Sequence, residues 1–283
     1  FKDNIKKISN HSGFTFVEGD IRNTELLDLH LPECTHICHQ AALGSVPRSI
    51  QDPRRTNDFN IVGSLNVLSK AQEFSIKRFV FASSSSVYGD NIDMPKRENL
   101  TGKVLSPYAV TKSALEDYSR VFNLIHGIET IGLRYFNVFG PRQSPEGAYA
   151  AVIPLFMKSL SECRRPTIFG DGEQTRDFTY VQNAVNANIL ALFGEVPEAY
   201  GKTFNIACGK TFSINDILAK IQDCMSEKLG IAEFKPIYGP PRDGDIKDSL
   251  ADLSEAKRCL SYVPEVEFSE GIERTVNWFT QKK

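Results

Sequence analysis

Two side chains on one stretch of the chain, Tyr108 and Lys112, have the chemistry of a general base held beside a cation. They lie four residues apart, so a helix opened by Ser106-Pro107 would place both on one face. A tyrosine with a pKa near ~10 is a poor base at neutral pH, but a nearby ammonium stabilises the phenolate, at about 1.4 kcal/mol for each unit of pKa. The spacing therefore predicts that Lys112 lowers the pKa of Tyr108.

Hydroxyl groups precede this pair at the end of a predicted strand. Residues 76–82 (IKRFVFA) form an apolar run typical of a strand buried on both faces, and four serines at 83–86 follow it directly. In open α/β sheets, ligands bind at the carboxyl ends of the strands. We therefore expect a serine of this run to approach Tyr108.

The order of these features resembles the short-chain dehydrogenase/reductase superfamily, and the sequence VYG at 87–89 resembles its extended, sugar-nucleotide branch. Residues 134–143 (RYFNVFGPRQ) are similar to the signature of that branch. The ordered matches run from about Asp20 to Trp278 and closely resemble NAD-dependent UDP-N-acetylglucosamine 4-epimerases.

The resemblance implies an α/β fold with a doubly wound, Rossmann-type parallel sheet and a smaller α/β substrate-binding domain. Residues 1–138 and 177–208 are expected to form the NAD-binding domain, and residues 139–176 and 209–283 the UDP-sugar-binding domain. Periodicity predicts early strands at 14–20 and 35–39, and one strand over 129–139. The sequence contains no G-x-x-G-x-x-G turn, so we expect it to lack the first βαβ unit and to bind a dinucleotide poorly on its own.

The implied chemistry is NAD-dependent 4-epimerisation of a UDP-N-acetylhexosamine, UDP-GlcNAc to UDP-GalNAc, through a transient 4-keto sugar. In such enzymes the Tyr, here Tyr108, is the acid/base, and the Lys, here Lys112, holds the nicotinamide ribose. Counting back from VYG at 87–89 assigns the hydroxyl that bonds the reacting sugar to Ser84, with Ser85 as the neighbouring alternative.

The resemblance also implies two sets of binding residues. The cofactor set comprises Asp20, Ile21, Gln40, Ala41, Ala42, Tyr108, Lys112, Tyr135 and Val138. The substrate set comprises Ser45, Ser84, Ser86, Asn137, Gln143, Ala151, Val152, Arg176, Arg242, Asp245 and Ser249. Of these, Arg176 and Arg242 are the planar cations suited to a diphosphate.

Three alternatives to this function stay open. A uronic-acid 4-epimerase shares nearly all these motifs, because nothing in the sequence decides whether the sugar C6 carries a hydroxyl or a carboxylate. A 4,6-dehydratase needs an Asp-Glu pair where this sequence has Ser85-Ser86, which disfavours it. A non-catalytic, cofactor-sensing protein has no need of Tyr108, Lys112 and Ser84 together. The small Ser249 leaves room for an N-acetyl group at C2.

Composition and net charge limit the classes of protein to which the chain can belong. The chain has 283 residues, 41% of them hydrophobic, and a net charge of −2, so it gives no electrostatic case for a nucleic-acid or membrane partner. The six cysteines are scattered, as suits a reducing cytoplasm. Residues 34–39 (CTHICH) resemble a metal cluster but read as a strand whose alternate residues face opposite ways, so no metal is expected.

A homodimer through Leu115, Tyr118, Phe122 and residues 61–71 is expected by resemblance.

Overall fold

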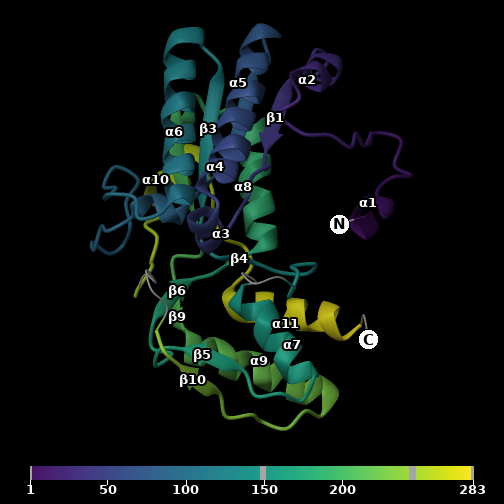
Figure 1. Cartoon of the computed structure of the whole chain (residues 1–283), viewed down its shortest axis with the longest axis vertical. Coiled ribbons are helices and arrows are strands. Elements are labelled where there is room, and N and C mark those ends of the chain that lie inside the picture. The colour runs from purple at the N-terminus through teal and green to yellow at the C-terminus, as the bar shows by residue number, and fades with distance from the viewer. Residues whose placement is uncertain (1, 147–150, 242–246, 282–283) are drawn as a thin grey trace.

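The computed structural model describes residues 2–146, 151–241 and 247–281. The chain forms two halves that lie one above the other along the long axis (Figure 1). The upper half is built around a parallel sheet in the order β1-β2-β3-β8. Its strands are β1 (His36–His39), β2 (Arg78–Ser84), β3 (Glu129–Tyr135) and β8 (Lys202–Ile206). The expected Rossmann-type α/β sheet is therefore present.

Helices cover both faces of this sheet, and strand β2 shows which side chains meet them. Phe79 and Phe81 point to one face, where they pack with Leu68 and Leu115. Val80 points to the other face and packs with Ala187. This alternation is the period of two expected for a strand, and covering both faces explains why the strand reads as one apolar run.

These contacts show which helices lie on each face of the upper sheet. On the Phe79 face lie α5 (Gly63–Glu73) and α6 (Pro107–His126), and on the Val80 face lie α8 (Val181–Phe193) and α10 (Ser254–Leu260). The remaining short elements are α1 (Lys2–Lys6), α2 (Thr24–His30), α3 (Val46–Gln51), α4 (Pro53–Asn57), the π-helical turn η1 (Asp58–Val62), and the 3₁₀ turns η2 (Ser85–Tyr88) and η3 (Pro197–Ala199).

The lower half has its own core, in which Phe139, Phe156, Ile217 and Ile272 are buried. Three helices supply most of it: α7 (Val152–Ser161), α9 (Ile214–Leu229) and α11 (Phe268–Thr280). Short strands pair as β4 (Val138–Phe139) with β7 (Thr179–Tyr180), β5 (Thr167–Phe169) with β10 (Ile237–Gly239), and β6 (Thr175–Asp177) with β9 (Thr211–Ser213). The chain crosses between the halves repeatedly, as Figure 1 shows by colour.

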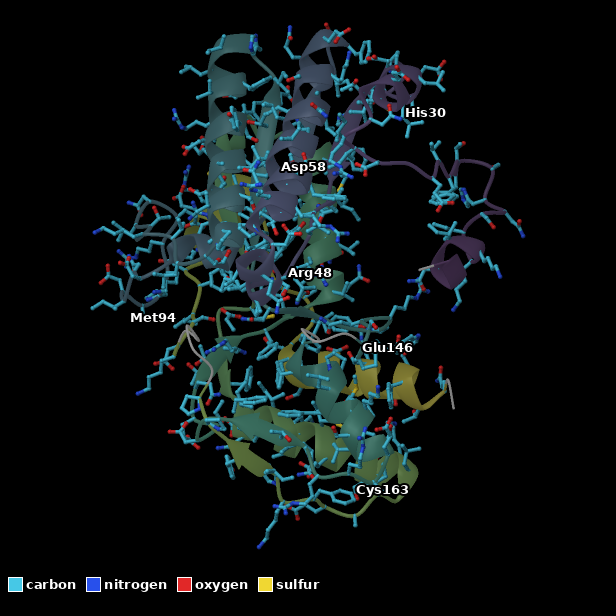
Figure 2. All side chains as sticks on the ribbon, viewed as in Figure 1. His30, Arg48, Asp58, Met94, Glu146 and Cys163 are labelled. Carbon is cyan, nitrogen blue, oxygen red and sulfur yellow. The ribbon has the colours of Figure 1, made fainter. Side chains whose placement is uncertain are left out.

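Labelled side chains mark the two sides of the junction between the halves. Figure 2 places Arg48 at the lower end of the upper half and Glu146 near the upper edge of the lower half. Met94 projects from the loop between η2 and α6, and its side chain is 40% exposed.

Helix α6 begins and ends where the sequence indicates. Ser106 is its N-cap, and its Oγ accepts a hydrogen bond from the Ala109 N–H at 3.1 Å, with Pro107 in the first turn. Gly127 ends the helix with φ 72°, a left-handed conformation that glycine adopts without steric cost. The predicted helix carrying Tyr108 and Lys112 is confirmed.

Two strand predictions are wrong. Residues 14–20 form no strand, although their alternating pattern favours an extended chain, because a strand also needs a ladder partner and none of the described residues provides one. The predicted strand over 129–139 is two strands, because Asn137 adopts φ 36° and turns the chain between β3 and β4. Asparagine tolerates this left-handed conformation better than most residues.

Within the described ranges, no helix combines the length and apolar character needed to cross a membrane. The same residues contain no group of three or more His, Cys, Asp or Glu side chains able to hold a metal ion. On β1, Ile37 and His39 are buried while His36 is half-buried and Cys38 is exposed.

His39 is an ionisable group inside the upper core. Its Nε2 lies 2.8 Å from Ser64 Oγ, and its ring stacks on Phe79 with 5.5 Å between centroids. Burial, with a smaller contribution from the Lys112 charge, lowers the pKa of His39 to about 4. The imidazole is therefore neutral in the folded protein at neutral pH.

This burial predicts a loss of stability in acid. The unfolded chain takes up a proton on His39 near pH 6.5, whereas the folded chain does so only near pH 4, so stability is present above this window and falls as the pH drops through it. The loss should reach about 3 kcal/mol at pH 4. Urea unfolding at pH 7 and pH 4.5 should show a smaller pH dependence for His39→Gln than for the parent. His36→Gln, on the half-buried side of the same strand, is the control and should keep the parent's dependence; equal behaviour of both variants would contradict the assignment.

Candidate active site

Tyr108 and Lys112 lie on the face of α6 that packs on the carboxyl end of β2. The Lys112 side chain is buried, its Nζ donates to the Ala82 carbonyl at 2.8 Å, and this nitrogen lies 5.8 Å from the centre of the Tyr108 ring. The Tyr108 side chain is half-buried and hydrogen-bonds Ser84. The structure thus brings together the three residues that the sequence placed at the reaction centre.

The electrostatics of this pair differ from the sequence-based expectation. Burial raises the pKa of Tyr108, and the hydrogen bond with Ser84 offsets only part of that rise. Lys112 directs its ammonium to the Ala82 carbonyl, and burial lowers its own pKa to about 8. The pKa of Tyr108 is therefore shifted in the direction opposite to the prediction, because both groups lose hydration and the Lys112 ammonium is bonded to a backbone oxygen.

The four serines after β2 have different environments. Ser83 is 3% exposed, and its hydroxyl donates to Glu116 of α6. Ser84 caps η2, where its Oγ accepts from the Ser86 N–H at 3.2 Å. Ser85 is half-buried in the same turn. The Oγ of Ser86 is buried and has no hydrogen-bond partner.

A cavity of about 410 Å³ opens in the lower half, next to the end of β3. Its lining includes six of the expected substrate or cofactor residues: Asn137, Val138, Gln143, Ala151, Val152 and Arg176. Apolar side chains from β5 and α7, such as Phe169 and Phe156, complete the walls. A pocket of this size, mostly apolar with a few polar groups, is typical of a small-molecule site.

Strand β3 connects the cavity to the strand end beside Tyr108 and Lys112. Ser84 is the register partner of Tyr135 across the β2–β3 ladder, and Asn137 follows two residues later. The Asn137 amide donates to the Asp177 carbonyl at 2.8 Å, which fixes its side chain at the cavity. Gln143 donates from Nε2 to the Val138 carbonyl at 3.1 Å.

Arg176 and Ser249 lie on neighbouring segments beside the cavity. Arg176 Nη1 donates to the carbonyls of Thr175 at 2.8 Å and Lys247 at 3.0 Å. Ser249 is 8% exposed, and its N–H bonds the Thr175 carbonyl. Arg242 and Asp245, expected in the same site, lie outside the described residues.

Four buried side-chain atoms among the described residues have no hydrogen-bond partner. They are Ser86 Oγ, Ser119 Oγ, Gln143 Oε1 and Ser249 Oγ. Leaving such an atom unsatisfied costs about 1–3 kcal/mol, so native proteins rarely do so without a functional reason. Three of the four belong to residues that the sequence assigned to the substrate.

Two residues of the expected cofactor set, Asp20 and Ile21, end or follow the extended segment 14–20. The side chain of Asp20 is 40% exposed, and both its oxygens accept from Arg22, whose bonding keeps the pKa of Asp20 below its usual value. Ile21 packs its side chain over Gly63 at the start of α5. An exposed carboxylate at this place suits a donor such as an exocyclic amine.

The residues after β1 fit the middle of a dinucleotide. Ala41 and Ala42 are exposed at the carboxyl edge of the sheet, where methyl groups leave room for a ligand. Gln40 Nε2 donates to Asn188 Oδ1 at 3.1 Å and to the Tyr135 hydroxyl at 3.3 Å. Ser45 has φ 99°, and its Oγ accepts from the Arg48 N–H as the cap of α3. These residues therefore fit NAD.

Sequence reasoning missed two buried carboxylates that organise the site. Glu116 bonds Ser83 and Arg134 beneath the catalytic pair, and Asp177 accepts backbone N–H groups of Cys208, Gly209 and Ala251. The spacing Tyr108, Lys112, Glu116 was a usable signal, because positions i, i+4 and i+8 share a helix face. Asp177 carried no comparable signal.

Comparisons with known proteins bear directly on this site. A profile of the NAD dependent epimerase/dehydratase family matches residues 2–207. A UDP-N-acetylglucosamine 4-epimerase from Methanobrevibacter ruminantium M1, solved in complex with UDP-N-acetylmuramic acid, superposes with a TM-score of 0.90 at 39% identity, over 97% of this chain and 85% of that one.

Two further relatives carry different sugars in their names. A putative UDP-glucose 4-epimerase of Methanocaldococcus jannaschii is 37% identical over 265 residues, which cover 93% of this chain and 83% of the relative. A UDP-glucuronic acid 4-epimerase from Bacillus cereus, solved with UDP-glucuronic acid and NAD, superposes with a TM-score of 0.89 at 31% identity, over 100% of this chain and 86% of that one.

These matches confirm the resemblance found in the sequence, the Rossmann-type fold, an enzyme of the epimerase type and a family that depends on NAD. The family match alone extends through all four strands of the upper sheet and both catalytic-pair residues. The chain therefore belongs to the NAD-dependent epimerase/dehydratase family.

Proposed function

We propose that this protein is a UDP-sugar 4-epimerase whose preferred substrate is a UDP-N-acetylhexosamine, UDP-GlcNAc or UDP-GalNAc. The observation that carries the proposal is the cavity of about 410 Å³ lined by Asn137, Gln143 and Arg176, which lies beyond Tyr135, the register partner of Ser84. Resemblance to the 4-epimerases named above supports the reaction type.

The residues divide the work between the two halves. In the upper half, Tyr108 exchanges a proton with the 4-hydroxyl of the sugar. Ser84, which hydrogen-bonds Tyr108, also bonds that sugar hydroxyl, and Lys112 holds the cofactor ribose. In the lower half, Asn137, Gln143 and Arg176 line the cavity that takes the UDP group. Bound NAD supplies the hydride acceptor and donor for C4.

The two cores support the expected domain division in outline. The upper core contains residues of β1, β2, β3 and β8 and also of α10, whereas the lower core runs from Phe139 to Tyr180 and resumes at Ile214. Apart from α10 and residues 178–180, we propose that residues 1–138 and 177–208 bind NAD and that residues 139–176 and 209–283 bind the UDP-sugar.

Tyr108→Phe tests the reaction. Removing the hydroxyl that carries the proton should lower kcat by about 10²-fold or more. Full-length protein is incubated with UDP-GlcNAc and, in parallel, with its uronic-acid form, and the epimers are separated by chromatography. Tyr118→Phe, a 40% exposed tyrosine of the same helix, is the matched control and should turn over like the parent. Equal turnover by Tyr108→Phe would remove the mechanism, and conversion of only the uronic acid would change the substrate.

Ser249→Tyr tests the substituent at C2. The larger side chain should exclude the N-acetyl group, so activity on UDP-GlcNAc should fall at least tenfold more than activity on UDP-glucose. Ser249→Ala removes the orphaned hydroxyl but keeps the space, and should preserve the preference for the N-acetyl sugar. An equal loss on both sugars in Ser249→Tyr, with the fold intact by circular dichroism, would argue against this position.

A homodimer through the outer face of α6 completes the proposal. Val110, Tyr118 and Ile125 share that face and are 48%, 40% and 66% exposed. Val62 of the adjacent η1 is 42% exposed. Leu115, which was expected to contribute, is buried inside the chain's own core and is withdrawn from the interface. Phe122 and the apolar residues Val67, Leu68 and Ala71 of the expected 61–71 face also pack in that core.

Sedimentation equilibrium at micromolar concentration should return a dimer for the parent and a monomer for the double variant Tyr118→Asp, Ile125→Asp, because buried charges oppose association. The control is Val185→Asp, Ile189→Asp, which alters two similarly exposed residues of α8 and should remain dimeric. A monomeric parent would end the dimer hypothesis.

A further inference from the structure

Glu116 lies on the same face of α6 as Tyr108 and Lys112, one turn beyond the lysine. Its side chain is 13% exposed. Arg134 of β3 makes a bidentate contact with the carboxylate, in which Nε donates to Oε1 at 2.9 Å and Nη2 donates to Oε2 at 2.7 Å. Ser83 Oγ donates to the same Oε1.

These bonds connect the helix to the strand end at the reaction centre. Ser83 directly precedes Ser84, the residue bonded to Tyr108, so the Glu116 carboxylate holds the neighbour of Ser84 against α6. Arg134 in turn donates to the Tyr88 hydroxyl at 3.1 Å and to the Glu98 carbonyl at 3.0 Å. A bidentate, charge-assisted contact of this kind fixes direction as well as distance.

The groups around Lys112 indicate a second role for Glu116. The Lys112 ammonium donates to the Ala82 carbonyl from β2 and lies over the Tyr108 ring from its own helix. The buried His39 from β1 is near enough for the Lys112 charge to contribute to the lowering of its pKa, and it is neutral at pH 7. Burial lowers the pKa of Lys112, and the negative charge of Glu116 opposes that shift. Arg134 pairs with the Glu116 carboxylate through two hydrogen bonds.

We propose that Glu116 is a positioning residue for the Tyr108–Lys112 pair, which locks α6 to the strand end carrying Ser84 and supplies the negative charge that holds Lys112 as an ammonium. The inference rests on the proposed roles of Tyr108 and Lys112. It extends them to a residue that touches neither substrate nor cofactor.

Glu116→Gln tests the charge, because the amide is isosteric with the carboxylate and still offers an acceptor. The full-length protein is labelled with ¹⁵N-lysine, and the Nζ signal of Lys112, assigned with Lys112→Arg, is followed against pH. The midpoint of the titration should fall by about one pH unit or more in Glu116→Gln. The control is Glu129→Gln, which breaks the ion pair between Arg78 and Glu129. These residues begin β2 and β3, at the ends of the strands away from Ser84, so the variant should leave the midpoint in place. No shift in Glu116→Gln, or an equal shift in the control, would overturn the charge role.

Ser83→Ala tests the positioning, and it keeps the proposal testable if Glu116→Gln does not fold. Losing the bond to Glu116 should lower kcat several-fold with little change in KM for the UDP-sugar. Thr130→Val is the control, because the Thr130 hydroxyl also ties β3 to α6, by donating to the Ser119 carbonyl at 2.8 Å far from Ser84. It should leave kcat unchanged. An unchanged kcat in Ser83→Ala, or the same loss in both variants, would overturn the positioning role. The lysine titration needs no turnover, so the proposed function can fail in Tyr108→Phe while Glu116 is still tested.

Discussion

The buried ion pair between Glu116 and Arg134 is the constraint on which the geometry of the upper half depends. Moving two charges out of water is costly unless each finds hydrogen-bond partners, and here the carboxylate and the guanidinium are both supplied with several. Removing one partner of such a pair typically costs about 3–5 kcal/mol, because the other charge is left buried and uncompensated. Helix α6 therefore has one favourable position on the sheet, and Tyr108 and Lys112 take their places from it.

The same network reaches the last strand of the sheet. The Tyr88 hydroxyl accepts from Arg134 and donates to Asn205 Oδ1 at 2.6 Å, and the Asn205 amide bonds the carbonyls of Lys96 and Asp252. Asp177 is a second buried carboxylate, at the junction of the halves. It accepts hydrogen bonds from the N–H groups of Cys208 and Gly209, which follow β8, and from that of Ala251, near Ser249. Burial raises the pKa of Asp177 to about 6, against the effect of those backbone bonds. Two polar clusters thus fix segments that are distant in sequence.

The sequence predicted what local pattern controls and missed what only tertiary contact creates. The start of α6 follows from Ser106-Pro107, and the apolar run at 76–82 follows from burial on both faces, so both were predictable. Residues 14–20 have a strand pattern, but ladder pairing depends on a neighbour that no local pattern reveals. The pKa of Tyr108 was misjudged for the same reason, because spacing shows that Lys112 is near but does not show that Ala82 takes its ammonium.

Apart from Ser119 in α6, the described residues with an unsatisfied buried polar atom are ones expected to bind the substrate, whereas the structural polar groups are satisfied. Glu116, Arg134, Asp177 and Asn205 are buried or nearly so, and each has its hydrogen bonds met by the chain itself. Ser86, Gln143 and Ser249 are placed on the segments that the scaffold fixes, yet each keeps a buried atom without a partner. Under the proposed function, the scaffold satisfies its structural carboxylates and amides and fixes the segments that would contact the sugar nucleotide. Specificity for the sugar would then depend on residues that the scaffold positions but does not itself use.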